Sequence, residues 1–120
     1  MSKNGVRLAV DFTINDGKTA EFQAIAGKMI AGSQQEPGTL AFEFYLSRDG
    51  KRCRLVETYL DADALVAHFN GPVVKDLVPK LLETSSLTRF EVYGDPGPKA
   101  TQMLLGFGAE IFDYWGGLSR

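Results

Sequence analysis

The chain has 120 residues, enough for one domain with a single hydrophobic core. Its 15 acidic and 13 basic residues give a net charge of −2, which excludes a broad basic surface for nucleic acid. No apolar run approaches the length of a membrane span, and the first residues lack the long apolar region of a signal peptide. We therefore expect a cytoplasmic protein with no membrane or nucleic-acid partner.

A strand and a helix are the first two elements expected along the chain. Apolar and polar residues alternate over residues 6–14, which is the period of a strand with one buried face. From residue 18 to about 33, apolar residues recur every three or four positions, as in a helix that packs by one stripe. Turn residues at 15–17 separate the two elements, and Glu36-Pro37-Gly38 ends the helix.

Two further alternating runs, 40–46 and 53–59, predict a hairpin. They flank Asp49-Gly50, a dipeptide that tolerates the positive φ angles of a tight turn. With a two-residue loop, Phe42 faces Glu57 across the strands. One face of the hairpin then carries a single charge among apolar side chains: Leu40, Phe42, Phe44, Leu46, Cys53, Leu55, Glu57 and Tyr59. A three-residue loop would move every side chain to the opposite face.

A short helix follows the hairpin and carries the only histidine. Asp61 is placed to cap its first turn. Residues three and four apart are neighbours on a helix, so one side collects Ala64, Leu65, His68 and Phe69. This spacing places His68 on a stripe that faces the core.

A second helical piece and a fourth strand are expected after residue 70. Pro72 is suited to a helix start, and residues 73–82 continue the helical spacing. Pro79 should kink or split this helix, because proline lacks the backbone N–H that a helix interior needs. Residues 87–93 alternate again and predict the last strand of the domain.

This order of elements predicts an α+β fold. Strand, helix, strand, strand, helix, strand is the ferredoxin-like split β-α-β arrangement, an antiparallel four-stranded sheet with helices on one face. We assign residues 1–95 to this domain. Because the second face of such a sheet is uncovered, we expect a homodimer.

Residues 96–120 form a C-terminal extension after a hinge rich in glycine and proline. This extension is too apolar to remain in water, so we expect it to pack on the same domain or on the partner subunit. The residues that need cover are Met103, Leu104, Leu105, Phe107, Ile111, Phe112, Tyr114 and Trp115. We expect a short helix over residues 99–105, an extended segment after it, and Trp115 as an anchor for the tail.

Several of these residues match a known family in their order and spacing. Glu57-Thr58-Tyr59 ends a strand, Asp61 caps the next helix, His68 lies on its last turn, and Glu36-Pro37-Gly38 precedes the hairpin. Residues 6–93 thereby resemble the antibiotic biosynthesis monooxygenase family, which includes quinol monooxygenase-like proteins. The resemblance implies a dimeric α/β barrel, built from two ferredoxin-like sheets, with a pocket between sheet and helices in each subunit.

The resemblance also implies a reaction and the residues to carry it. It is the oxidation of a small aromatic or phenolic compound, such as a quinol or anthrone, by dioxygen without a cofactor. His68 suits the role of base because the ordinary pKa of histidine is near neutrality. Burial among phenylalanines can raise the pKa of Glu57 until it also acts near pH 7. Tyr59 is a candidate hydroxyl donor.

Four more residues are predicted to bind the substrate. Phe42 and Phe69 belong to the two apolar surfaces between which we expect the pocket. Tyr45 is a second candidate hydroxyl donor, and Asp11 on the first strand is a weaker candidate.

Structural roles are the alternative for the same residues. The ring of His68 can bond to a backbone carbonyl or a nearby carboxylate, and Glu57 can pair with an arginine or a helix terminus. The protein would then be a non-catalytic dimer that binds a small hydrophobic ligand.

Metal and haem sites are not expected. One histidine and one cysteine are too few for a typical metal centre. Haem-degrading relatives of this fold use a histidine on the later helix, where residues 72–82 have none and Val78 is near the expected place. Cys53 has no partner for an internal disulfide, and we expect it to be buried.

Overall fold

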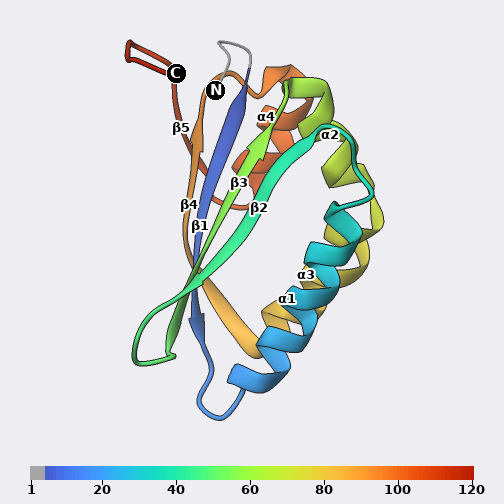
Figure 1. Ribbon diagram of the computed structural model, residues 1–120, viewed down its shortest axis with the longest axis vertical. Helices are drawn as coiled ribbons and strands as arrows, with labels where there is room; N and C mark the ends of the chain where they lie inside the picture. The colour runs from blue at the N-terminus through green and yellow to red at the C-terminus, as the bar shows by residue number, and fades with distance from the viewer. Residues whose placement is uncertain (1–4) are drawn as a thin grey trace.

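Residues 5–120 are described by a computed structural model, in which helices cover one face of a single sheet (Figure 1). Within these residues the sheet has five strands in the order β2-β3-β1-β4-β5. The strands are β1 (Val6–Ile14), β2 (Thr39–Leu46), β3 (Arg52–Tyr59), β4 (Ser85–Tyr93) and β5 (Glu110–Phe112). The helices are α1 (Thr19–Ser33), α2 (Ala62–Asn70), the π-helical turn η1 (Val73–Leu77), α3 (Val78–Thr84) and α4 (Gly97–Gly106).

The predicted α+β, ferredoxin-like arrangement is confirmed for the first four strands, which pair antiparallel. The sheet differs from the prediction at one edge, where β5 pairs parallel with β4 and makes the sheet mixed. The sheet is open rather than closed into a barrel within this one chain. No helix within residues 5–120 is long and apolar enough to cross a bilayer.

Alternation along β1 decides which side of the sheet becomes the core. Every second residue of β1 points toward the helices and is buried, as predicted: Val6, Leu8, Val10, Phe12 and Ile14. The helix α1 covers these residues with Phe22, Ala26 and Met29. The core therefore lies between the sheet and the helices, and the outer face of the sheet is uncovered (Figure 1).

The hairpin has the predicted register. Phe42 lies opposite Glu57 and Phe44 opposite Leu55, so the predicted face turns toward the helices. The loop is wider than two residues, because the strands end at Leu46 and resume at Arg52. The same side chains still face the helices, because Ser47 pairs with Arg52 as in the predicted register: the backbone N–H of Ser47 donates to the carbonyl of Arg52 at 2.8 Å.

The two helical predictions after the hairpin are also confirmed. The Asp61 side chain accepts a hydrogen bond from the backbone N–H of Ala64 at 2.9 Å, which caps α2. Leu65, His68 and Phe69 are the buried residues of α2. The next helical piece is split into η1 and α3, and Pro79 lies in the first turn of α3, where no N–H is required.

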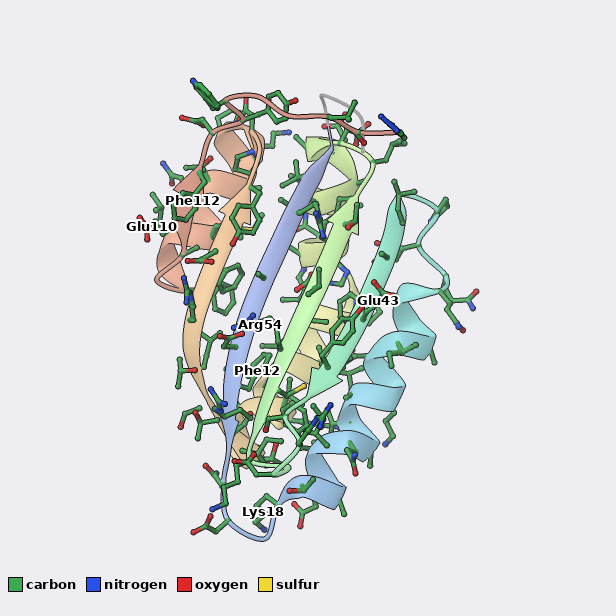
Figure 2. All side chains as sticks on the ribbon, turned by 60° about the vertical axis from the view of Figure 1, so that its left-hand side comes forward. Phe12, Lys18, Glu43, Arg54, Glu110 and Phe112 are labelled. Carbon is green, nitrogen blue, oxygen red and sulfur yellow. The ribbon has the colours of Figure 1, made fainter. Side chains whose placement is uncertain are left out.

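The C-terminal extension forms a helix and an edge strand. The helix α4 begins two residues before the expected start, because Pro98 fits the first helical turn. Figure 2 shows Glu110 and Phe112 along the sheet edge beside β4. Trp115 is 98% exposed and does not anchor the tail on its own chain. Packing of the extension on a partner subunit stays a prediction. The division into domains at residues 1–95 and 96–120 also stays a prediction, and residues 1–4 lie outside the described residues.

Two adjacent leucines of α4 test whether the extension is part of the fold. Leu104 is fully buried, whereas Leu105 is 57% exposed. We expect Leu104→Ala to lower the free energy of unfolding by about 2–5 kcal/mol, the usual range for a truncated core leucine. Leu105→Ala, the matched control, should change it by less than about 0.5 kcal/mol. Urea unfolding measures both free energies. An effect of Leu104→Ala as small as that of Leu105→Ala would show that α4 is an appendage.

Candidate functional site

A buried histidine faces a buried carboxyl group where α2 packs on β3. His68 is 2% exposed and Glu57 is 5% exposed. The Nε2 atom of His68 lies 3.7 Å from Oε1 of Glu57, within ion-pair range but beyond a hydrogen bond. The register of the hairpin points Glu57 inward, and the helical spacing after Asp61 points His68 toward it.

Each of these two groups is held by a partner behind it. The Nδ1 atom of His68 lies 2.7 Å from Oε1 of Glu36, which also accepts a hydrogen bond from the Thr39 hydroxyl at 2.8 Å. The Tyr59 hydroxyl donates to Oε1 of Glu57. The four side chains therefore form a continuous series from Glu36 through His68 and Glu57 to Tyr59.

Glu36 reaches His68 because the turn that ends α1 lies close against α2. A Cβ atom added at Gly38 would lie 2.5 Å from the Cβ of Ala64, so the turn approaches α2 only with glycine there. The carbonyl of Gly38 accepts a hydrogen bond from the backbone N–H of Leu60 at 2.9 Å, which ties the turn to the end of β3.

The partner on Nδ1 decides which ring nitrogen of His68 is free. A carboxylate only accepts hydrogen bonds, so the contact with Glu36 places a proton on Nδ1. In the neutral ring the lone pair is then on Nε2, the atom that faces Glu57. His68 can accordingly accept a proton at Nε2.

Burial shifts the two groups at the other end of the series. Removal from water raises the pKa of Glu57, against the opposing effects of His68 and of the Tyr59 hydrogen bond. Burial, together with the neighbouring Glu57, raises the pKa of Tyr59 well above its usual value. Tyr59 is therefore a proton donor in a hydrogen bond, and Glu57 keeps its proton to a higher pH than an exposed glutamate.

Glu57 and His68 line a small apolar cavity between the sheet and the helices. Its volume is about 40 Å³, and most of its wall consists of aliphatic and aromatic side chains. The ring of His68 lies 5.5 Å from that of Phe42 and 6.0 Å from that of Phe69, measured between centroids. The complete wall is Val10, Phe12, Met29, Phe42, Leu55, Glu57, His68, Phe69, Val74, Val78, Leu87, Phe90 and Phe107.

This arrangement suits proton transfer in a dry environment. One wall offers a nitrogen that accepts a proton, and the facing wall offers a carboxyl group that holds one.

Nowhere in residues 5–120 do three or more histidine, cysteine, aspartate or glutamate side chains gather in a way that could hold a metal ion.

Comparison with known families identifies the chain at the level of its family. Residues 5–80, which include β1 through the start of α3, match the family described as antibiotic biosynthesis monooxygenase. The chain belongs to this family. Among curated protein sequences, none matches the chain.

Solved structures share the fold of this family member. MupZ from Pseudomonas fluorescens superposes with a TM-score of 0.86 at 24% identity, over 98% of this chain and 95% of MupZ. SnoaB from Streptomyces nogalater, a cofactor-independent oxygenase, has a TM-score of 0.68 at 19% identity, over 77% of this chain and 93% of SnoaB. Rv0793 from Mycobacterium tuberculosis has a TM-score of 0.64 at 23% identity, over 73% and 91% of the two chains.

Most of the predicted site residues of this monooxygenase-family chain meet at the cavity. His68, Glu57, Phe42 and Phe69 all line it. Tyr59 is fully buried and lies behind Glu57. The structure thus brings together five of the predicted residues, and their catalytic or binding roles stay predictions.

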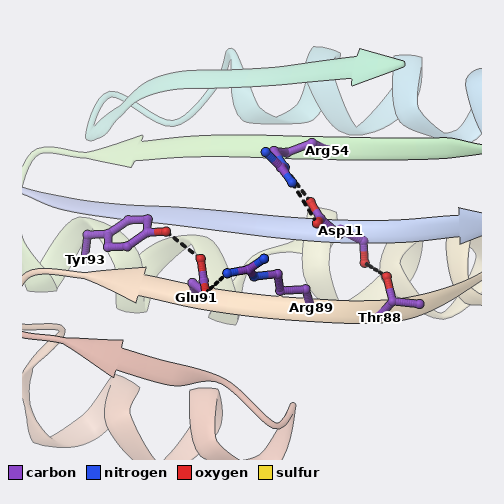
Figure 3. A network of polar contacts seen from close by, with 6 residues as sticks. All are labelled: Asp11, Arg54, Thr88, Arg89, Glu91 and Tyr93. Atoms are coloured by element: carbon purple, nitrogen blue, oxygen red, sulfur yellow. Dashed lines mark hydrogen bonds and ion pairs between the residues drawn. The ribbon is translucent and has the colours of Figure 1, made fainter. Parts of the chain in front are cut away.

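Tyr45 and Asp11 lie on the opposite face of the sheet, because they occupy the outward positions of strands that alternate. Asp11 pairs with Arg54 through two contacts of 2.7 and 3.0 Å (Figure 3). The hydrogen bond with Arg54 lowers the pKa of Asp11, the reverse of what a base near neutral pH needs. The structure therefore does not bring either residue to the cavity.

Two residues of the site were missed from the sequence. The sequence places Glu36 in the turn that ends the first helix and in a motif of the family resemblance, and it allows a nearby carboxylate as a partner for His68 without identifying Glu36 as that partner. Phe107 was expected to need cover, yet it lines the cavity itself. In both cases the available signal was a residue type with no partner nearby in the sequence. The contact between Glu36 and His68 spans 32 residues, and a contact over this distance leaves no periodic pattern.

The raised pKa of Glu57 leads to a pH-dependent stability. In the unfolded chain Glu57 regains its ordinary pKa of 4.5, so above this pH the folded state holds more protons than the unfolded state. Its contribution to stability is therefore complete below pH 4.5 and is lost as the pH rises through the higher pKa of the folded state. We expect the stability of Glu57→Gln relative to wild type to increase over this window.

Urea unfolding at a series of pH values measures this difference. Glu110→Gln, at an exposed position on the sheet edge, serves as the control. A constant difference between Glu57→Gln and wild type across the series would show that folding does not change the pKa of Glu57.

Proposed function

We propose that this protein is a cofactor-independent monooxygenase that oxidises a small aromatic or phenolic compound, of the quinol or anthrone type, with dioxygen. The observation that carries the proposal is the pairing of His68 Nε2 with the carboxyl group of Glu57 at one apolar cavity. Membership of the antibiotic biosynthesis monooxygenase family supports it. SnoaB, which shares the fold, is a cofactor-independent oxygenase.

The chemistry needs a base, an acid and exclusion of water. His68 accepts the proton of the phenol or enol at Nε2, and the resulting anion passes one electron to dioxygen. The two radicals combine into a peroxide, to which Glu57 supplies a proton. In an anthrone-type substrate the hydroperoxide then loses water, so CH₂ and O₂ become C=O and H₂O.

Glu36 and Tyr59 act through the two reacting groups. Glu36 holds the proton on Nδ1 of His68 and so keeps Nε2 free for the substrate. Tyr59 donates to Glu57 and holds this carboxyl group toward the cavity. Both are positioning residues in this proposal.

Dioxygen uptake with a panel of anthrones and hydroquinones tests the proposal. We expect His68→Ala to lower kcat by the roughly 10²–10⁴-fold typical of a lost acid-base group. Glu36→Gln should lower kcat by a smaller factor and shift the pH profile of kcat. His68 keeps Nε2 in this variant, but Glu36 no longer imposes the tautomer of the ring. Asp63→Asn, exposed on the same helix, is the control and should leave uptake unchanged. Full activity in a folded His68→Ala variant would remove the histidine from the mechanism.

A non-catalytic binding protein is the second candidate function. The observation that favours it is that His68 and Glu57 already have protein partners in Glu36 and Tyr59. Such a dimer would bind a small hydrophobic ligand in the same cavity. Binding without dioxygen uptake across the panel would favour this function over oxygenation.

We also propose a homodimer built through the uncovered face of the sheet, as a dimeric α/β barrel. This face carries ion pairs between Asp11 and Arg54 and between Arg89 and Glu91, and the Tyr93 hydroxyl donates to Glu91 (Figure 3). Figure 2 shows Arg54 in the middle strands of this face. Groups of both signs on one face suit a self-complementary contact.

Sedimentation velocity at micromolar concentration tests the dimer. We expect a stable dimer that buries roughly 1,200 Å² or more in total. Arg54→Glu should shift the equilibrium toward monomer, because it places like charge beside Asp11. Glu21→Lys, on the exposed side of α1, is the charge-changing control. A wild-type monomer at this concentration would refute the proposal.

A further inference from the structure

Part of the cavity wall is formed by a residue of the C-terminal extension. Phe107 lines the cavity and is also partly exposed to solvent. It lies at the C-cap of α4, outside residues 5–80 that match the family. The cavity wall is therefore completed by a segment that the family match does not include.

Phe107 holds this position through two aromatic contacts. Its ring lies 6.1 Å from that of Phe69 on α2, with 27° between the planes. The same ring lies 6.0 Å from that of Phe90 on β4, with 28° between the planes. Phe107 thus joins the helix layer to the sheet across the cavity by ring contacts, which are weak individually.

The backbone around Phe107 is suited to a local movement. Gly106 and Gly108 flank it, and Gly108 has a φ of 80° in the left-handed region that favours glycine. A Cβ atom at either glycine would meet nothing within 4 Å, so no side chain crowds these glycines, and the turn is held by backbone hydrogen bonds to the carbonyls of Leu104 and Leu105. Leu104 and Ala109, on either side, are buried and remain as anchors when the turn moves.

The size of the cavity requires such a movement. The cavity measures about 40 Å³, whereas a cavity that admits benzene measures about 150 Å³. Phe107 lines the same cavity as His68 and Glu57 and is partly exposed to solvent. Phe42, Phe69 and Phe90 also border the cavity, but each belongs to a regular helix or strand.

We propose that Phe107 is an aromatic gate, and that a flat aromatic ring of the substrate displaces it and takes over its contacts with Phe69 and Phe90. The inference rests on the proposed function for the nature of the cavity and assigns the entry of its aromatic substrate to Phe107. A saturated ring of the same size fills the space but does not replace the ring contacts, so the gate selects by flatness.

Calorimetric titration with 2-naphthol and with its saturated counterpart 2-decalol tests the gate. In Phe107→Ala no ring has to be displaced. We expect 2-naphthol to bind this variant about 5- to 100-fold more tightly than wild type, the range expected for two aromatic contacts. The gain for 2-decalol should be similar, because the same ring is displaced, but 2-decalol should bind wild type and variant more weakly than 2-naphthol because it does not replace the ring contacts.

Phe107→Leu and Phe112→Ala are the matched variants. Phe107→Leu keeps apolar bulk without the ring and should give an intermediate gain for 2-naphthol even if the alanine variant is unstable. Phe112 lies on β5 against Tyr93, outside the cavity wall, and its truncation should not change the affinity.

Two results would overturn the gate. Weaker or unchanged binding of 2-naphthol by both Phe107 variants would show that Phe107 is a fixed wall. Equal affinities of 2-naphthol and 2-decalol for both wild type and Phe107→Ala would show that the cavity selects by size alone. Because the assay measures binding and not turnover, absence of dioxygen uptake would refute the proposed function without deciding this result.

Discussion

The hydrogen bond between Glu36 and His68 joins the turn after α1 to the last turn of α2, and the site depends on it. A buried histidine needs a partner for each ring nitrogen that carries a proton. Glu36 provides this partner at Nδ1 and leaves Nε2 toward Glu57. The close approach at Gly38 and the cap at Asp61 position the two ends of this contact.

The two faces of the sheet give carboxyl groups opposite properties. Glu57 is buried among apolar side chains, and removal from water raises its pKa. Asp11 lies on the other face beside Arg54, whose hydrogen bond lowers its pKa. Alternation along the strands therefore places carboxyl groups on opposite faces of the sheet, where their pKa values shift in opposite directions. The inner face combines the raised pKa values of Glu57 and Tyr59 with an apolar cavity.

The extension after residue 95 changes the common fold in two ways. The strand β5 covers the free edge of β4, which shields backbone groups that would otherwise be unpaired. The turn after α4 brings Phe107 to the cavity. The match with MupZ spans 98% of the chain and so takes in this extension, unlike the family match to residues 5–80. The extension is therefore shared with the fold of MupZ and lies outside the residues that match the family.

The amino-acid sequence by itself determined the first four strands, the hairpin register, the capped α2 and the inward side of His68 and Glu57. These features follow from periods of two and 3.6 residues and from caps, all of which are local. Tertiary structure alone decided that Glu36 is the partner of His68 and that Phe107 lines the cavity. Periodicity tells which face a residue occupies, but a contact between distant segments depends on how the layers pack.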